Sequence, residues 1–168
     1  MGSSAAKSCL PPVVNDKVRL LILGSLPGEA SLAAGRYYAH PRNQFWRLLE
    51  TVIEEPLQAL PYEERLQALR RRGIGLWDTV ASAERKGSLD GAMRDIAANP
   101  LQDVIAHLPR LEAIAFNGGT AARIGRRELG PAPLLLLDLP SSSPALTIPF
   151  VAKVERWAVL RPFVIDSY

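Results

Sequence analysis

Short apolar runs alternate with amphipathic segments along most of this chain. Four runs bounded by Gly, Pro or Asp have the character of buried parallel strands, and they cover residues 18–24, 74–80, 111–117 and 134–139. Between them, helical spacing of apolar positions appears in residues 43–54, 62–72, 101–108, 119–129 and 150–160. Strands that alternate with helices predict an α/β fold: a three-layer sandwich around a central, mostly parallel four-stranded sheet.

The chain is long enough for one well-buried core. Its 168 residues predict a single domain over residues 17–168, preceded by a flexible N-terminal arm over residues 1–16. No run approaches the ~18 apolar residues of a membrane span, and residues 1–12 show no secretory signal. We therefore expect a cytoplasmic monomer with no membrane partner.

Charge and cysteine content say little about the binding partner, but they bear on disulfides and metal sites. The formal net charge is +3, and 16 of the 20 basic residues are Arg. Arginine suits phosphate contacts and stacking on bases, but a preference for Arg codons explains the excess equally well. Cys9 is the only cysteine and His40 and His107 the only histidines, so a disulfide or a structural zinc site is not expected. We expect neither a metal nor an organic cofactor.

The segments that follow the four strands carry most of the unusual residues. They are residues 24–43, 78–90, 117–120 and 140–146. In a parallel sheet the ligand crevice lies beyond the carboxyl ends of the strands. We therefore predict that these segments meet at one edge and form the active site there.

The first of these segments begins with a glycine-rich turn and ends in an aromatic run. The turn (Gly24, Ser25, Leu26, Pro27 and Gly28) leaves backbone N–H groups open to a ligand, but it is also an ordinary way to leave a strand. Pro41 fits the first position of a helix, which would place Asn43 in its first turn. Asn43 can orient a water molecule or cap the helix, and for an isolated Asn capping is the commoner role. Tyr38 can stack on a planar base.

Two later segments offer polar groups at the same edge. Asn117 ends a strand before two glycines, so its amide can meet the polar edge of a base, although Asn-Gly is also a common turn. Residues 141–143 are serines next to Pro144, and such a loop can hold phosphate or serve as a plain linker. Leu146 can act as an apolar wedge in a base stack. Residues 84–88 form a charged stretch, either a clamp on the DNA backbone or a solvated turn.

Taken in order, these motifs resemble those of the uracil-DNA glycosylase superfamily over roughly residues 18–160. The run YYAHPRNQFW is similar to the mismatch-specific uracil/thymine-DNA glycosylases, which carry AHPxNxFW after a GxNPG loop. The full set more closely resembles the hypoxanthine-DNA (deoxyinosine) glycosylase branch: GSLPG, YYAHPRNQFW, GLWDTVASAERKGS, FNGGTA and LPSSSPA.

Two positions depart from the patterns of these relatives. Leu26 stands where the Asn of GxNPG positions the hydrolytic water, and the hypoxanthine branch implies that the Asn of HPxN, here Asn43, does so instead. Leu146 stands where that branch more often reads SPAN, and leucine cannot make the hydrogen bonds of that Asn.

The resemblance implies a monofunctional DNA glycosylase that hydrolyses the N-glycosidic bond of a deaminated base, chiefly hypoxanthine, during base excision repair. Asn43 would hold the water, Tyr38 would stack on the flipped base, and Asn117 would hydrogen-bond its polar edge. The backbone of residues 24–28 would steady the departing base. The expected DNA contacts are His40, Arg85, Lys86, Ser141, Ser142, Ser143, Pro144, Ala145 and Leu146.

Other functions stay open at this point. A uracil- or mismatch-directed glycosylase shares the same motifs. A non-catalytic homologue that binds damaged DNA is also possible, because Leu26 lacks the amide of the mismatch-specific enzymes. A small α/β hydrolase of nucleosides would have the same fold, although the chain lacks a nucleophile elbow.

Overall fold

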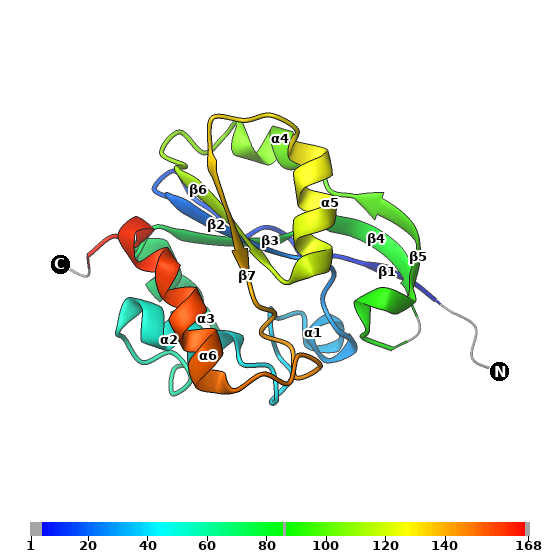
Figure 1. Cartoon of the computed structure of the whole chain (residues 1–168), viewed down its shortest axis with the longest axis horizontal. Helices are drawn as coiled ribbons and strands as arrows, with labels where there is room; N and C mark the ends of the chain where they lie inside the picture. The colour runs from blue at the N-terminus through cyan, green and yellow to red at the C-terminus, as the bar shows by residue number, and fades with distance from the viewer. Residues whose placement is uncertain (1–4, 86, 167–168) are drawn as a thin grey trace.

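A computed structural model describes residues 5–85 and 87–166. Its centre is a four-stranded parallel sheet in the order β3-β2-β6-β7 (Figure 1). The strands are β2 (Leu20–Gly24), β3 (Ile74–Asp78), β6 (Ala113–Asn117) and β7 (Leu135–Leu139). The predicted α/β class and the predicted parallel sheet are therefore confirmed.

Helices cover both faces of this sheet and make the three layers. On one face lie α2 (Phe45–Ile53), α3 (Tyr62–Arg71) and α6 (Phe150–Trp157), which continues into the 3₁₀ segment η2 (Ala158–Phe163). The other face packs against α4 (Leu101–Ile105) and α5 (Gly119–Leu129). Strand β2 is apolar on both faces of the sheet because its side chains alternate between them. Leu20 and Ile22 pack with α2, α3 and α6, and Leu21 and Leu23 pack on the face covered by α4 and α5.

A second sheet, which the sequence did not predict, extends from one side of the domain (Figure 1). It is antiparallel and contains β1 (Ala5–Ser8), β4 (Val80–Arg85) and β5 (Met93–Ala98), with the 3₁₀ turn η1 (Asp90–Ala92) before β5. The apolar run 74–80 thus belongs to two strands, because the chain leaves the parallel sheet after Asp78.

The expectation of a flexible arm is wrong for residues 5–16. Strand β1 pairs with β4 over four residues, from Ala5 opposite Arg85 to Ser8 opposite Ser82. Val13 is buried and exchanges backbone hydrogen bonds with Leu76. Residues 1–4 lie outside the described part of the chain.

The segment between β2 and α2 also differs from the prediction. It contains a short helix, α1 (Glu29–Ala34), which Gly35 ends in the left-handed conformation at φ +65°. Pro41 lies in a turn, and α2 begins at Phe45 rather than at residue 43. Asn43 therefore precedes the helix instead of lying in its first turn.

Strand register brings the ends of the parallel strands into line. Gly24 pairs with Asp78 at the end of β2 and β3, and Asn117 pairs with Leu139 at the end of β6 and β7. Side chains and loops that follow these residues must therefore converge at one edge of the sheet.

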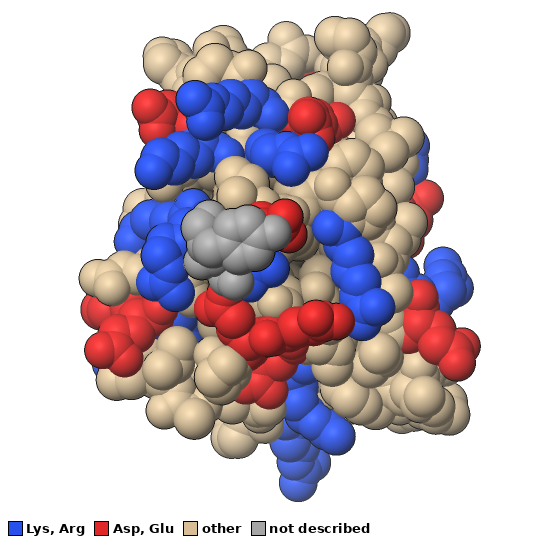
Figure 2. All heavy atoms as spheres, turned by 90° about the vertical axis from the view of Figure 1, so that its left-hand side faces the viewer, with Lys and Arg blue, Asp and Glu red and all other residues tan. Residues whose placement is uncertain are grey.

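The side of the molecule nearest the C-terminus carries charges of both signs. Figure 2 shows Lys and Arg side chains interspersed there with Asp and Glu side chains. This face is therefore not a uniformly positive surface of the kind that attracts DNA phosphates.

Candidate active site

A cavity of about 540 Å³ opens at the carboxyl end of the parallel sheet. All four segments that follow the strands contribute to it, as predicted from the sequence. Most of the predicted site residues line it: Gly24, Ser25, Leu26, Pro27, Gly28, Tyr38, His40, Asn43, Asn117, Ser141, Ser142, Ser143, Pro144, Ala145 and Leu146. Their roles stay predictions at this point.

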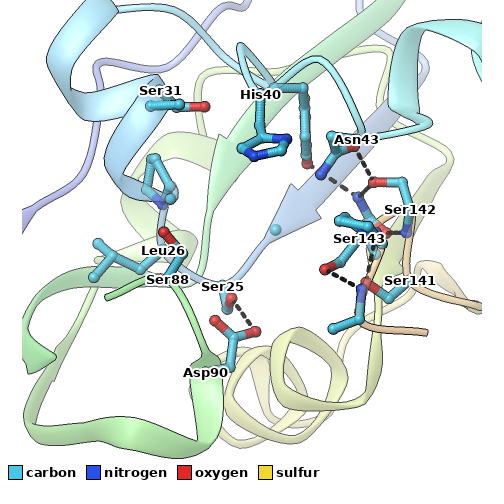
Figure 3. Close-up of a pocket in the computed structure, with 18 of the residues that line it drawn as sticks. Ser25, Leu26, Ser31, His40, Asn43, Ser88, Asp90, Ser141, Ser142 and Ser143 are labelled. Atoms are coloured by element: carbon cyan, nitrogen blue, oxygen red, sulfur yellow. Dashed lines mark hydrogen bonds between the residues drawn. The ribbon is translucent and has the colours of Figure 1, made fainter. Parts of the chain in front are cut away.

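One side of the cavity is a hydrogen-bonded set that we call the amide wall: Asn43, Asn117 and Ser142 (Figure 3). The Ser142 hydroxyl donates to Asn43 Oδ1 at 2.8 Å and accepts from Asn117 Nδ2 at 2.9 Å. The backbone N–H of Ser142 donates to Asn117 Oδ1 at 2.9 Å. Ser142 is buried, so it links two amides that come from distant parts of the chain.

The hydrogen bonds of Asn43 decide which of its atoms faces the cavity. Its Oδ1 accepts from the backbone N–H of Phe45 at 3.0 Å and from the Ser142 hydroxyl. A backbone N–H can only donate, so the atom beside it must be the amide oxygen, and both lone pairs of that oxygen are used. The Nδ2 group has no partner among the described residues. Asn43, one residue before the N-cap Gln44, therefore satisfies the first backbone N–H of α2 and still has its own N–H donors available.

The same reasoning fixes the orientation of Asn117. Its Nδ2 donates to the Tyr38 hydroxyl at 3.3 Å and to the Ser142 hydroxyl, and among the described residues its Oδ1 accepts only the N–H of Ser142. Both donors are therefore used, and one lone pair of the oxygen is open. Gly118, at φ +100°, lets this wall close, because a Cβ there would lie 3.2 Å from Ser141 Cβ.

Tyr38 lies at the base of the amide wall. Its ring stacks on Phe45, with ring centroids 3.8 Å apart and planes 11° apart. Its backbone is left-handed, at φ +54°, which is unusual for a bulky residue and places the ring in this position. Burial raises the pKa of the Tyr38 phenol, and nearby Asp78 raises it further, so this group stays neutral.

The opposite side of the cavity, which we call the loop wall, consists of residues 24–28 and 88–90. The Ser25 hydroxyl donates to Asp90 Oδ2 at 2.6 Å (Figure 3). The Ser88 hydroxyl accepts from the backbone N–H of Glu29 at 2.9 Å. The Leu26 side chain packs with Val80, Ala83 and Ile124. Leu26 therefore anchors the loop to the second sheet, a role that an apolar side chain fills better than an amide.

Arg85 is not the surface clamp that the sequence suggested. Its side chain is buried, and its guanidinium donates to the backbone oxygens of Leu26, Pro27 and Gly87. Its Nη1 also lies 3.7 Å from Asp90 Oδ1. Arg85 thus holds the loop wall together from inside and cannot reach a DNA phosphate. Lys86 lies outside the described residues.

Exposed side chains surround the mouth of the cavity. His40 is exposed, and its Nδ1 accepts the N–H of Arg42 at 3.0 Å. Leu89 on the loop wall and Leu146 beyond the amide wall are 64% and 36% exposed. Two apolar side chains thus flank the opening from opposite sides.

Several lining residues were not singled out from the sequence: Ala30, Ser31, Tyr37, Asp78, Leu89 and Asp90. A signal was present for Asp78, since it is an acidic residue at the end of an apolar strand, at the edge where ligands bind. Tyr37 faces away from the opening, and its hydroxyl donates to the backbone oxygen of Pro11 at 2.8 Å.

Two further features bear on function. Within residues 5–85 and 87–166, the structure contains no group of three or more His, Cys, Asp or Glu side chains that could hold a metal ion. Among the same residues, no helix has the length and apolar character needed to cross a membrane.

Comparison with known proteins agrees with this architecture. The model of the Uracil DNA glycosylase superfamily matches residues 11–161. A hypoxanthine DNA glycosylase of Methanosarcina barkeri is 43% identical over 112 residues, which cover 67% of this chain and 71% of the relative. A hypoxanthine DNA glycosylase of Methanosarcina acetivorans is 39% identical over 115 residues, which cover 68% and 73%.

A solved structure shows the same fold. It is the solution NMR structure of a candidate uracil DNA glycosylase from Methanosarcina acetivorans, with a TM-score of 0.82 and 34% sequence identity, covering 95% of this chain and 99% of that one. The family match, the fold and the position of the cavity lead to one assignment. The chain belongs to the uracil DNA glycosylase superfamily.

Proposed function

We propose that this protein is a monofunctional DNA glycosylase that removes deaminated bases, chiefly hypoxanthine, from DNA. The observation that carries the proposal is the amide wall, where Ser142 fixes the orientation of Asn43 and Asn117 in one cavity. The relatives named as hypoxanthine DNA glycosylases support the choice of base. A cavity of about 540 Å³ is in the size range of small-molecule sites and can hold a purine.

The open lone pair of Asn117 supports selection of deaminated bases. Hypoxanthine, xanthine and uracil carry a ring N–H on the Watson–Crick edge, whereas adenine and cytosine carry an acceptor there. The Asn117 oxygen accepts such an N–H, and its fixed orientation excludes a donor at that point. An adenine would place its N1 lone pair against this oxygen, which leaves both groups unpaired. The wall thus distinguishes hypoxanthine from adenine and uracil from cytosine, the two deaminations that turn the ring acceptor into a donor.

Asn43 is suited to hold the water. Its Nδ2 donates to the water oxygen, and the remaining lone pair of that oxygen is directed at C1′ of the sugar. The N-glycosidic bond breaks with its electron pair passing to the base, the water oxygen bonds to C1′, and a proton of the water ends on the base. A sugar with oxocarbenium character accepts water without a strong base. Tyr38 and the backbone of residues 24–28 contact the flipped base.

No lysine is among the described residues that line the cavity. A lyase step through a Schiff base requires a lysine amine at the sugar. The described part of the site therefore favours hydrolysis alone, with an intact abasic strand as the product.

A panel of duplexes tests the proposal. Each duplex carries one labelled inosine, uracil, xanthine or undamaged adenine, and abasic product is detected after alkaline cleavage. We expect the fastest release from inosine and none from adenine. A chain that releases uracil alone would be a uracil-directed enzyme. Tight binding of inosine DNA with no product from any duplex would show a non-catalytic homologue and contradict the proposal.

A further inference from the structure

Asp78 is a buried carboxyl group at the floor of the cavity to which the mechanism above gives no role. It is the last residue of β3 and only 3% exposed, yet it is among the residues that line the cavity. Its Oδ2 is shielded from solvent and has no hydrogen-bond partner among the described residues. A buried carboxyl without a partner is costly to keep and therefore requires an explanation.

Gly24 shows where the other oxygen of Asp78 lies. A Cβ built on Gly24 would come within 2.8 Å of Asp78 Oδ1 and 3.1 Å of the Tyr38 hydroxyl. Both polar atoms therefore border one small space above the Gly24 backbone, which any larger residue would fill. Tyr38 and Gly24 are also the residues against which the flipped base is expected to lie, so Asp78 Oδ1 is directed at the base-binding part of the cavity.

The surroundings of Asp78 favour its protonated form. Burial raises the pKa of this carboxyl well above its ordinary value, and the negative charge of Asp90 raises it further, while Arg85 lowers it. Among the described residues, the other ionisable groups that face it are the phenols of Tyr38 and Tyr37, whose pKa values burial raises, so neither supplies a positive charge. The guanidinium of Arg85 is directed to the loop wall and Asp90.

We propose that Asp78 is a base-binding residue, whose protonated carboxyl donates a hydrogen bond from Oδ1 to an acceptor atom of the flipped base. This inference rests on the proposed function and extends it. On a deaminated purine the acceptors are the carbonyl oxygen and the ring nitrogens. As the N-glycosidic bond breaks, its electron pair gives these atoms negative charge, and a neutral donor in a cavity of low dielectric stabilises that charge.

The protonation state of Asp78 decides whether this side chain speeds or slows departure of the base. An ionised Asp78 would repel the departing base, whereas the neutral acid stabilises it. Asp78 keeps its proton throughout, and the reaction consumes only the water. If Asp78 were instead a general base for that water, activity would require the ionised form, and the dependence on pH would be opposite.

Single-turnover rates on the inosine duplex across the neutral and alkaline range test this. The wild-type rate should fall as Asp78 loses its proton. Asp78→Asn keeps a neutral donor, so it should retain most of the wild-type rate at the low end of this pH range, and its rate should no longer fall as the pH rises. Asp78→Ala should be roughly 10²-fold slower. Asp138→Asn is the matched control, because Asp138 is exposed and pairs only with Arg126 among the described residues.

Three results would overturn the inference: a rate that rises with pH through this range, an Asp78→Asn variant as slow as Asp78→Ala, or an Asp78→Ala variant as fast as the wild type. Carbon-13 NMR of the Asp78 carboxyl, assigned with Asp78→Asn, gives a readout that needs no activity. A protonated carboxyl at pH 7 supports the inference, and an ionised one contradicts it. If the wild type fails on every duplex, the proposed function fails, and the NMR result still decides the state of Asp78.

Discussion

The two walls of the cavity are fixed by different means. The amide wall is held by neutral side chains that bond to one another, with Ser142 between Asn43 and Asn117. The loop wall is held by one buried cation, Arg85, that bonds to backbone oxygens. The amide wall thus presents side-chain groups whose donor or acceptor character is set, whereas the loop wall presents backbone whose shape is set. We expect damage to the first to reduce the rate and damage to the second to reduce stability.

Arg85→Met should have the largest effect, and it should appear in the free energy of unfolding. The change removes a buried cation that bonds to the backbone oxygens of Leu26 and Pro27, and it leaves Asp90 without its ion pair. Leaving the buried backbone oxygens without their donors costs about 1–3 kcal/mol each. The lost ion pair adds less, because the Asp90 side chain is 37% exposed. Urea unfolding followed by circular dichroism measures it.

The exposed pair of Arg126 and Asp138 supplies the control. These side chains are 43% and 59% exposed, so Arg126→Met should cost less than about 1 kcal/mol. If Arg85→Met costs no more than this control, Arg85 does not hold the loop wall.

Asn43→Ala should have the next largest effect, and it should appear in the rate. Removing the amide takes away the donor to the water, so the single-turnover rate on the inosine duplex should fall about 10²-fold or more. The change also removes the cap on α2, because Phe45 N–H loses its acceptor.

Asn43→Ser separates these two roles. Serine caps a helix about as well as asparagine, so stability should return, but its side chain is too short to present a donor to the water. A variant as slow as Asn43→Ala supports the water-holding role. Recovery of the rate along with stability would reduce Asn43 to a helix cap.

Ser142→Ala should have a smaller effect that acts through its neighbours. It leaves Asn117 Nδ2 without one acceptor and Asn43 Oδ1 without one donor. Such unpaired buried groups cost about 1–3 kcal/mol, and the two amides are then held less firmly in place. We expect a rate roughly tenfold lower.

A double-mutant cycle then shows whether the wall acts as a unit. In the Asn43→Ala background, Ser142→Ala should cost little more, because the group that it orients is already gone. Fully additive losses would show that Ser142 acts independently of Asn43, for example by direct contact with DNA.

The amide wall was more accessible to sequence analysis than the loop wall, for a physical reason. Asn43, Asn117 and the serines follow strand ends in short motifs, so local sequence brings them to the correct edge. The loop wall depends on β1, which pairs with β4 from the other end of the chain, and on β5, which follows β4 in a hairpin but is mostly exposed and lacks an apolar run. Arg85 lies in a charged stretch typical of a surface loop, and only this pairing buries it.

The same limit applies to Asp78 and to the atoms within the amides. The sequence placed Asp78 at the predicted edge, but its burial depends on Gly24 and Tyr38 packing around it, which no local pattern specifies. The sequence also left open whether Asn43 caps a helix or faces the ligand. In the structure Oδ1 accepts the first N–H of α2, and Nδ2 has no partner among the described residues, so the two amide atoms leave both tasks open to Asn43.

The smallest effect should distinguish the two rims of the cavity. Leu146 lies on a turn in which Ser143 Oγ accepts the N–H of Ala145 at 3.1 Å and Ser143 O accepts that of Leu146 at 3.2 Å. This turn continues the amide wall, so we expect Leu146, rather than a residue of the loop wall, to fill the gap left by a flipped base. Leu146→Ala should weaken binding of an inosine duplex about fivefold, equivalent to about 1 kcal/mol of lost apolar contact. Binding of the single strand should not change, because no stack has to be filled.

Leu89→Ala is the counterpart on the loop wall, with a side chain that is even more exposed at 64%. Fluorescence anisotropy measures the affinity of each variant for the inosine duplex and for the single strand, and the ratio of these two affinities is compared between variants. If Leu89→Ala lowers that ratio as much as Leu146→Ala does, the wedge is shared by both walls, and the division between a side-chain wall and a backbone wall does not extend to the rim.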